Sequence, residues 1–394
     1  MLPTVKRTIT RTLGTASIAV MAAMVGRQCV IAAHWMVRWP ANDDRWWAMV
    51  VIAGAVLSMV VVRMARTTGQ TTRAFSRALA DPPADLRPAP ARLVATALGV
   101  GLGAPLGLDG PALHLGGALG ARVARLVRRD GNERAWTIAA GVAALSMAIE
   151  APIAAALFVV EIGDRRWPRR RDFMPLIVGA AAAWAVRRLT GDVGGVLGAA
   201  PHLPTRSVAL AALVVGTICG LVGGWFARLL ARARAVRWGF RKRVTVAFVV
   251  LALALPIGWA ATDRAIFVGS GDRMFQWATS ARALPLAAAM ATFAVVIVTL
   301  VAVDLVGGLL LPLFTLGGLV GLVLARTWLP AAPTAFVVVA GGGALVAAAQ
   351  AAPATAVALG FAAVGWSASG WGTAAAVLIA VAASGGRRGQ HVRS

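Results

Sequence analysis

Six long apolar stretches, separated by polar connections, run along the 394-residue chain. They meet or approach the roughly 20 residues that a helix needs to cross a bilayer. They are Thr12–Val37 (interrupted by Arg27), Trp46–Val62, Phe173–Val186, Ser207–Leu230, Val244–Ala261 and Ala283–Val303. Between them lie shorter apolar pieces broken by glycine and proline. The pattern predicts an all-α protein that crosses a membrane several times.

The composition agrees with a polytopic membrane protein. Hydrophobic residues make up 59% of the chain, charged residues only 14%, and the mean hydropathy is +0.76; soluble proteins carry about 25% charged residues. Lys6, Arg7 and Arg11 precede the first apolar run, as in a signal peptide, but no clear cleavage site and soluble domain follow. We expect an uncleaved first helix and a single membrane domain over residues 1–394, without a soluble regulatory domain.

Positive charge is concentrated at alternate connections. The net charge is +24. The basic residues gather in 63–92, 165–171, 228–243 and 387–393, whereas the connections at 43–45, 192–206 and 263–282 are nearer to neutral. This positive-inside pattern predicts a multi-pass protein of the cell membrane with both termini in the cytoplasm. We expect the basic residues to face lipid headgroups of the bilayer rather than nucleic acid.

The remaining chemistry-bearing side chains are scattered. Cys29 and Cys219 are isolated within apolar runs, and the four histidines show no metal-ligand spacing. No nucleophile–base arrangement is recognisable either. We therefore expect no metal or other cofactor, and no enzyme.

The chain contains an internal duplication. The stretch "GLDGPALHLGGALGARVA" from Gly107 resembles "GLLLPLFTLGGLVGLVLA" from Gly308. In this alignment Pro111 pairs with Pro312, an offset of 201 residues (312 − 111). Fixed-period similarity of this kind marks repeated units.

A second block keeps the same register. "AAGVAALSMAIEAP" resembles "AGGGALVAAAQAAP", and Pro152 pairs with Pro353 at the same offset of 201 residues (353 − 152). Two blocks in one register, with no gap between them, indicate two copies. We place the copies at 46–188 and 207–384.

Each copy has an interrupted apolar segment at the matching position, Gly107–Pro111 and Gly307–Pro312. In a membrane, broken backbone is tolerated only where protein or a water-filled cavity satisfies the freed N–H and C=O groups. Paired interruptions in two halves therefore point to a substrate site near the midplane. The alternative is that glycine and proline only kink tightly packed helices.

The residue types of these segments suit a small anion. Glycine lets the backbone approach a ligand closely, and a proline in the first turn of a helix leaves neighbouring N–H groups free. A helix start offers unpaired N–H donors and a partial positive charge. Neither segment contains Lys or Arg, which would hold an ion too tightly for fast passage. The pattern favours transit of an anion over storage.

Four motifs, in order, resemble those of the CLC chloride channel and proton/chloride antiporter family. "GLDGPALHLGG" is similar to the GREGP-containing motif, and "GGLLLP" to the GxFxP motif. "EAPIAAALFVVE" resembles the helix written NAPLAGxLFxxE, and "QAAPATAVALGF" resembles its partner in the second half. The resemblance covers about Thr67 to Ala383.

The resemblance implies two inverted-topology repeats of broken, tilted helices, and a homodimer with one anion pathway in each subunit. Backbone amides of two motifs would line the pathway. By motif position these are Leu108, Asp109, Gly110, Leu309, Leu310 and Leu311, framed by the helix-break residues Gly107, Pro111, Gly307, Gly308 and Pro312. The serine of the family's GSGIP motif has its nearest counterpart at Thr68 in "TTGQTT"; an ordinary turn threonine is the alternative.

Asp109 occupies the position of the family's gating glutamate. A charged aspartate at mid-membrane depth costs roughly 2.5–3.5 kcal/mol on insertion scales, and it is tolerated if it sits in an amide-lined anion site as a tethered surrogate for the ion. Protonation, or displacement by an anion, would then open the path. The alternative is a helix-capping aspartate at the start of the helix that contains Pro111. Because aspartate is a methylene shorter than glutamate, its reach as a gate is reduced.

The sequence departs from the family pattern at several places. The antiporters' proton-relay glutamate, next to the position of Glu161, is replaced by Ile162. The chain has no tyrosine, so the aromatic hydroxyl that usually contacts the central ion is missing. By this resemblance, we also expect the sequence to stop before the position of the family's last helix. These departures favour passive, channel-like conduction of chloride or another small anion, with proton-coupled exchange and a non-transporting scaffold as alternatives.

The other acidic residues near the interruptions have simpler interpretations. We expect Glu150 to lie at a helix start and Asp304 to cap or pair locally, with a relay or pathway role as the alternative for each. Glu161 is expected to face Arg165 and Arg166, and His114 to be a neutral packed histidine. The sequence does not determine which anion is preferred.

Overall fold

The structure, a computed structural model, describes residues 2–42, 46–80, 88–127, 133–163, 169–191, 205–364 and 367–385. This part of the chain forms sixteen α-helices and no β-strand. Seven helices are long and apolar enough to cross a membrane. Each of the six predicted stretches corresponds to one of these helices; the seventh, Leu310–Thr327, begins at the second interruption.

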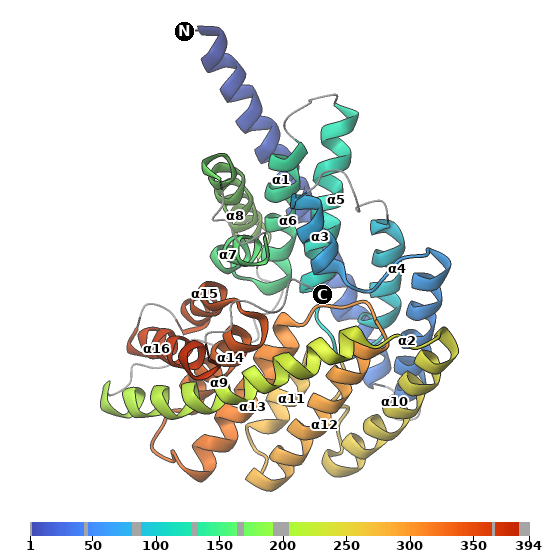
Figure 1. Ribbon diagram of the computed structural model, residues 1–394, viewed down its shortest axis with the longest axis vertical. Helices are drawn as coiled ribbons and strands as arrows, with labels where there is room; N and C mark the ends of the chain where they lie inside the picture. Colours follow the sequence, from blue (N-terminus) through green and yellow to red (C-terminus); the bar gives the residue numbers. More distant parts are fainter. Residues whose placement is uncertain are drawn as a thin grey trace.

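The described helices form two sets of eight in the same order. The first set is α1 (Leu2–Asn42), α2 (Trp47–Met64), α3 (Thr71–Ala80), α4 (Ala89–Gly99), α5 (Asp109–Leu126), α6 (Glu133–Ile149), α7 (Pro152–Ile162) and α8 (Arg170–Thr190). The second is α9 (Thr205–Ala235), α10 (Phe240–Thr262), α11 (Asp272–Ala278), α12 (Ala283–Ala302), α13 (Leu310–Thr327), α14 (Thr334–Gln350), α15 (Pro353–Val364) and α16 (Ala368–Ala383). Figure 1 shows most of the first set, blue to green, above the second set, lime to red, with α2 reaching down beside α10.

The two sets follow the offset found in the sequence. Helices α5 and α13 begin 201 residues apart (310 − 109) and end 201 apart (327 − 126), and α6 and α14 do the same (334 − 133 and 350 − 149). Unusual backbone conformations recur at this offset too. Glu150 and Ala351 have φ values of 54° and 55°, and Gly103 and Asp304 have 110° and 62°. The duplication therefore includes the detail of the turns.

The repeats meet at their interruptions and are inverted relative to one another. Gly107 and Gly308, which are equivalent residues of the two repeats, form an antiparallel bridge. The Gly107 N–H donates to the Gly308 carbonyl at 2.9 Å, and the Gly308 N–H donates to the Gly107 carbonyl at 2.7 Å. Equivalent residues that pair in antiparallel fashion are related by a local two-fold rotation, as expected for inverted repeats.

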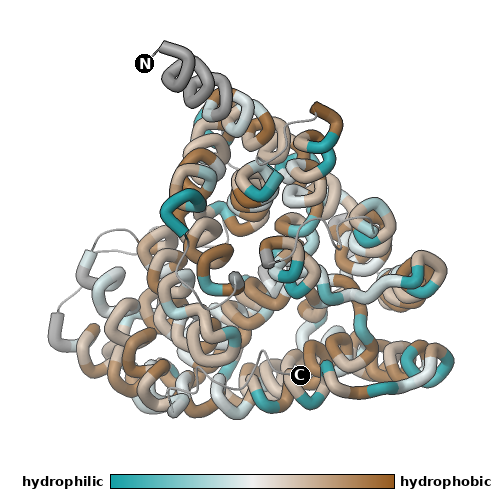
Figure 2. The backbone as a smooth tube through the Cα atoms, turned by 45° about the horizontal axis from the view of Figure 1, so that its top comes forward, coloured by the Kyte–Doolittle hydropathy of each residue, from teal (hydrophilic) through white to brown (hydrophobic). Residues whose placement is uncertain are grey.

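Small residues let the central helices pack closely. In the first repeat α5 lies on α6, and in the second α13 lies on α14. A Cβ atom on Gly116 would collide with the Ala140 carbonyl, and one on the equivalent Gly317 would collide with the Gly341 carbonyl. This is the backbone-to-backbone packing of membrane helices. Figure 2 shows brown and pale colours along most helices, with the teal segments short.

The duplication also extends over α1. This helix packs on α6 as α9 packs on α14, so α1 is the counterpart of α9. The predicted first copy, 46–188, does not include α1.

Candidate functional site

The site is formed where α5 and α13 begin. Each helix has a proline at its third position, Pro111 and Pro312. A proline in the first turn removes only an N–H that has no intrahelical partner. The Gly107–Gly308 bridge lies just before both helices and brings the two starts together. The predicted meeting of residues 107–111 and 307–312 is what the structure shows.

The carboxylate of Asp109 is turned toward the start of α13. Asp109 is only 1% exposed. Its Oδ2 accepts a hydrogen bond of 3.1 Å from the Leu310 N–H. The backbone N–H groups of Leu309 and Leu311 also stabilise the negative charge of the carboxylate. Its Oδ1 is buried with no hydrogen-bond partner. The carboxylate thus occupies an amide-lined position, where a negative group is held by backbone dipoles.

There is no spare room around this carboxylate. A Cβ atom on Gly308 would collide with the carboxyl group of Asp109, and one on Gly107 would collide with its Oδ1. Both positions therefore require glycine for close approach. The predicted helix-break residue Gly307 packs instead against the side chain of Leu106.

A threonine hydroxyl lies close to the start of α5, and it belongs to Thr71. Its Oγ1 is buried without a hydrogen-bond partner and lies against Gly110, where a Cβ atom would meet it at 2.6 Å. Thr68, the predicted contact, is exposed, and its carbonyl accepts a hydrogen bond from Arg92. The structure brings Thr71 to the site and not the side chain of Thr68.

Comparison with known proteins identifies the family. The family model for the voltage gated chloride channel matches residues 53–385 of the sequence. The chain belongs to the CLC family. A comparison with curated protein sequences gives no match.

Solved CLC structures share the fold at low sequence identity. A slow cyanobacterial Cl⁻/H⁺ antiporter is 20% identical with a TM-score of 0.80, covering 96% of this chain and 95% of that one. A CLC-type fluoride/proton antiporter is 20% identical with a TM-score of 0.79, covering 95% and 94%. A eukaryotic CLC transporter is 17% identical with a TM-score of 0.76, covering 96% and 72%. The predicted CLC-like fold is confirmed.

Next to the site of this CLC protein lies a buried arginine that sequence reasoning missed. Arg92 is 2% exposed and is the only buried cationic side chain in the described part of the chain. Its Nε donates to the Thr68 carbonyl at 2.9 Å, and its Nη1 lies 2.8 Å from Nε2 of His114. Because arginine can only donate, Nε2 accepts and the histidine is neutral, as predicted, with its proton on Nδ1.

The same arginine belongs to a polar network beside the second interruption. The Gly69 N–H donates a hydrogen bond to the carboxylate of Asp304, and the positive charge of Arg92 attracts this carboxylate. Arg243 forms an ion pair with it at 3.6 Å. Asp304 therefore has partners, but they come from distant parts of the chain and not from its own turn, where we expected it to cap or pair. The sequence held one signal for this network: Arg92 directly precedes the apolar run "LVATALGV".

Glu161 connects the two repeats of the CLC fold. Its carboxylate accepts hydrogen bonds from the Ala354 N–H at 2.7 Å, the Thr355 N–H at 2.9 Å and the Thr355 hydroxyl at 2.5 Å. It therefore caps the start of α15. The expected partners Arg165 and Arg166 lie outside the described residues. Glu150 forms an ion pair of 3.6 Å with Arg187 at the α6–α7 junction.

The neighbouring position Ile162 offers no titratable group. Its side chain is half-buried, and its carbonyl accepts a 2.7 Å hydrogen bond from Ser76. The end of α7 is thereby tied to α3, the helix that begins with Thr71.

Proposed function

We propose that the protein conducts chloride passively along a path that the Asp109 carboxylate gates. The observation that carries this proposal is the position of the carboxylate among the backbone amides of Leu309, Leu310 and Leu311. A carboxylate oxygen and a halide compete for the same N–H donors. The side chain is thus a tethered surrogate for the ion.

The path opens when the carboxylate leaves the amides. Protonation removes its negative charge and weakens its hydrogen bond with the Leu310 N–H, because charge-assisted hydrogen bonds are about twice as strong as neutral ones. A chloride ion that takes the same position displaces it directly. We assign the hydroxyl that contacts the ion to Thr71, because its Oγ1 is buried and unbonded beside the start of α5.

Passive conduction is favoured over exchange by two residues. A strict exchanger needs a second proton acceptor between the gate and the solution, and Ile162 cannot be one. The adjacent Glu161 already accepts three hydrogen bonds from α15. Proton-coupled exchange is the second candidate, because the structures with this fold include a Cl⁻/H⁺ antiporter and a fluoride/proton antiporter.

A flux assay on reconstituted protein distinguishes the candidates. Liposomes loaded with potassium chloride are diluted into low chloride, and valinomycin is added to shunt the voltage. We expect chloride efflux without uphill proton movement. Proton uptake driven by a chloride gradient would establish exchange, and no flux of chloride, nitrate, bromide or fluoride at any pH would leave a non-transporting scaffold.

We propose that the basic connections face the cytoplasm. Three of the four predicted basic connections gather around α3: Arg73 lies near Arg234 at the end of α9, and Ser76 bonds the end of α7. The fourth, 387–393, lies outside the described residues. Accessibility of cysteines introduced at Arg77 and at Asp263, labelled from outside intact cells, tests this orientation: only the second should react.

We also propose a homodimer in the membrane, as the CLC resemblance implies. An apolar groove between α7 and α8, which includes the exposed side chains of Ile153, Ile177 and Trp184, supports a subunit contact there. Single-molecule photobleaching of labelled protein in liposomes should give two steps, and a single step throughout would contradict the dimer.

A further inference from the structure

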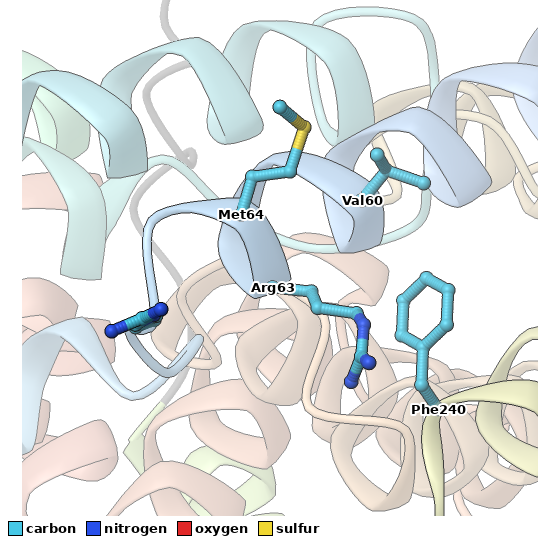
Figure 3. Close-up of a pocket in the computed structure, with 5 residues that line it drawn as sticks. Val60, Arg63, Met64 and Phe240 are labelled. Atoms are coloured by element: carbon cyan, nitrogen blue, oxygen red, sulfur yellow. The ribbon is translucent and has the colours of Figure 1, made fainter.

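A second site is formed where the end of α2 meets the start of α10. The two helices pack against each other and run in opposite directions. At one end the rings of Trp47 and Trp259 lie 5.7 Å apart. At the other end the guanidinium of Arg63 lies 4.9 Å from the centre of the Phe240 ring. Figure 3 shows Arg63 and Phe240 facing one another in a surface pocket.

This pocket lies at the depth of lipid headgroups. Both helices are candidate membrane spans. The distance along α2 from Trp47 to Arg63 is about 24 Å at 1.5 Å per residue, close to the hydrocarbon thickness of about 30 Å. Tryptophan marks one membrane interface and arginine the other. Leu57 and Leu253, on the outer faces of the pair, are 48% and 60% exposed, as expected of residues that face lipid.

The chemistry of the pocket suits a phosphate with an apolar tail. Its lining consists of Val60, Arg63, Met64, Arg66 and Phe240, two guanidinium groups and three apolar side chains without a carboxylate. Among the described residues, neither arginine forms an ion pair with an acidic side chain. The Phe240 ring restrains the Arg63 guanidinium, which is the residue type that binds phosphate in bidentate fashion.

The backbone at the end of α2 fixes the second arginine. Arg66 has a φ of 49°, a left-handed conformation that ends the helix. The Arg66 N–H donates to the Arg63 carbonyl at 3.0 Å, and the Thr67 N–H donates to the Val62 carbonyl at 3.1 Å. The chain thereby folds back and presents Arg66 beside Arg63 at one rim of the pocket.

We propose that this pocket binds the phosphate group of an anionic phospholipid. Arg63 and Arg66 hold the phosphate, and Val60, Met64 and Phe240 contact the glycerol and the first acyl carbons. The site is separate from the anion pathway, so it stands whether or not the protein conducts chloride.

Native mass spectrometry of the full chain in a non-ionic detergent tests the site. The probes are phosphatidylglycerol, phosphatidylcholine and inorganic phosphate. The wild type should bind phosphatidylglycerol in preference to phosphatidylcholine, and the R63Q/R66N double variant should bind it about 30-fold more weakly, since each basic residue near a membrane surface contributes roughly fivefold. Asparagine is chosen at position 66 because it tolerates positive φ.

A matched control removes the same charge elsewhere. The R170Q/R188Q variant takes one arginine from each end of α8, where Arg188 also lies over an aromatic ring, that of Trp184, at 5.5 Å. Its lipid binding should equal that of the wild type. If the double variant cannot be purified, R66N alone should show a fivefold loss. Equal binding by R63Q/R66N and wild type, an equal loss in the control, or inorganic phosphate binding as tightly as phosphatidylglycerol would overturn the proposal.

Discussion

The starts of α5 and α13 occupy equivalent positions in the two repeats but carry different chemistry. Asp109 is the first residue of α5, and Leu310 is the first residue of α13, 201 positions later (310 − 109). The carboxylate of the one accepts a hydrogen bond from the backbone amide of the other. Duplication supplied two facing helix starts with free amides. Because only the first carries an acidic side chain, the Asp109 carboxylate at the start of α5 competes with an anion for the N–H donors at the start of α13.

The turns that precede α3 and α11 show a similar contrast. The first turn is held by polar contacts: Arg92 donates to the Thr68 carbonyl, and the Gly69 N–H donates to the Asp304 carboxylate. In the second repeat the equivalent of Arg92 is Phe293 (293 − 92 = 201), whose ring stacks on Phe267 at 6.3 Å. One repeat thus stabilises its turn with a buried cation and the other with aromatic packing, which places fixed positive charge on one side of the site only.

Replacing the carboxylate should have the largest effect. In Asp109→Ala the amides of α13 lose their competitor, and chloride flux at pH 7 should rise at least tenfold. Wild-type flux should increase as pH falls, because protonation removes the competing charge, whereas flux through the variant should be insensitive to pH. The liposome efflux assay measures both. A variant slower than wild type would contradict the gating role.

Filling the space of a bridging glycine should have a nearly as large effect, in the opposite direction. In Gly308→Ala the added methyl group would lie where the Asp109 carboxylate lies, which is the position that the anion takes, so we expect efflux to fall about tenfold. The double variant G308A/D109A keeps this methyl group, so its flux should stay well below that of Asp109→Ala; equal flux in the two would contradict the shared position. Gly239→Ala, which has nothing within 4 Å, is the control and should behave as wild type.

Removing the buried cation tests the contrast between the two turns. Arg92→Met removes the hydrogen-bond donor to the Thr68 carbonyl and to Nε2 of His114, and a buried polar group that loses its partner costs about 1–3 kcal/mol of stability. Its guanidinium touches a residue five positions beyond Asp109, about 7.5 Å along the helix, so chloride affinity measured by calorimetry should fall about tenfold.

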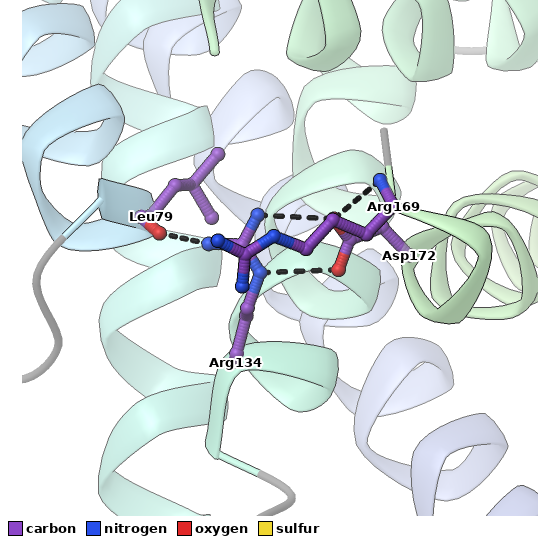
Figure 4. Close-up of polar contacts among 4 residues, drawn as sticks. All are labelled: Leu79, Arg134, Arg169 and Asp172. Atoms are coloured by element: carbon purple, nitrogen blue, oxygen red, sulfur yellow. Dashed lines mark hydrogen bonds and ion pairs between the residues drawn. The ribbon is translucent and has the colours of Figure 1, made fainter. Parts of the chain in front are cut away.

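A second packed arginine provides the control for this effect. Arg134 donates two hydrogen bonds of 3.0 Å to Asp172 and one to the Leu79 carbonyl (Figure 4). Arg134→Met should also lower the melting temperature, but it should leave chloride affinity unchanged. An equal loss of affinity in both variants would mean that Arg92 acts only through stability.

The smallest effect is expected from the threonines. Thr71→Val removes the buried hydroxyl beside Gly110, and a lost hydrogen bond to the ion of about 1 kcal/mol corresponds to a roughly fivefold lower chloride affinity. Thr68→Val should have no effect, because that side chain is exposed. A loss at Thr68 and none at Thr71 would reverse the assignment.

The predictable features are those that one stretch of sequence encodes by itself. Glycine and proline around Asp109 and Leu310 determine where two helices start, and the constant offset places the starts in equivalent positions. Thr71 was missed because Thr68 and Thr71 are both threonines near one turn, and only the packing of α3 on α5 decides which hydroxyl is buried.

The features that were not predictable join distant residues. Arg92 and His114 are 22 positions apart, and Glu161 reaches Thr355 across 194 positions. Both contacts depend on how helices pack in three dimensions, and neither follows from periodicity or motif spacing. The register of 201 residues predicts which segments are equivalent, but it does not predict the contacts that only one repeat makes.

Bromide soaked into crystals of the Asp109→Ala variant tests the shared amide site most directly, because its anomalous scattering locates the ion. We predict a bromide peak within hydrogen-bond distance of the Leu310 and Leu311 amides, at the position that the carboxylate holds in the wild type. Density for bromide elsewhere, with those amides unoccupied, would contradict the competition between carboxylate and anion.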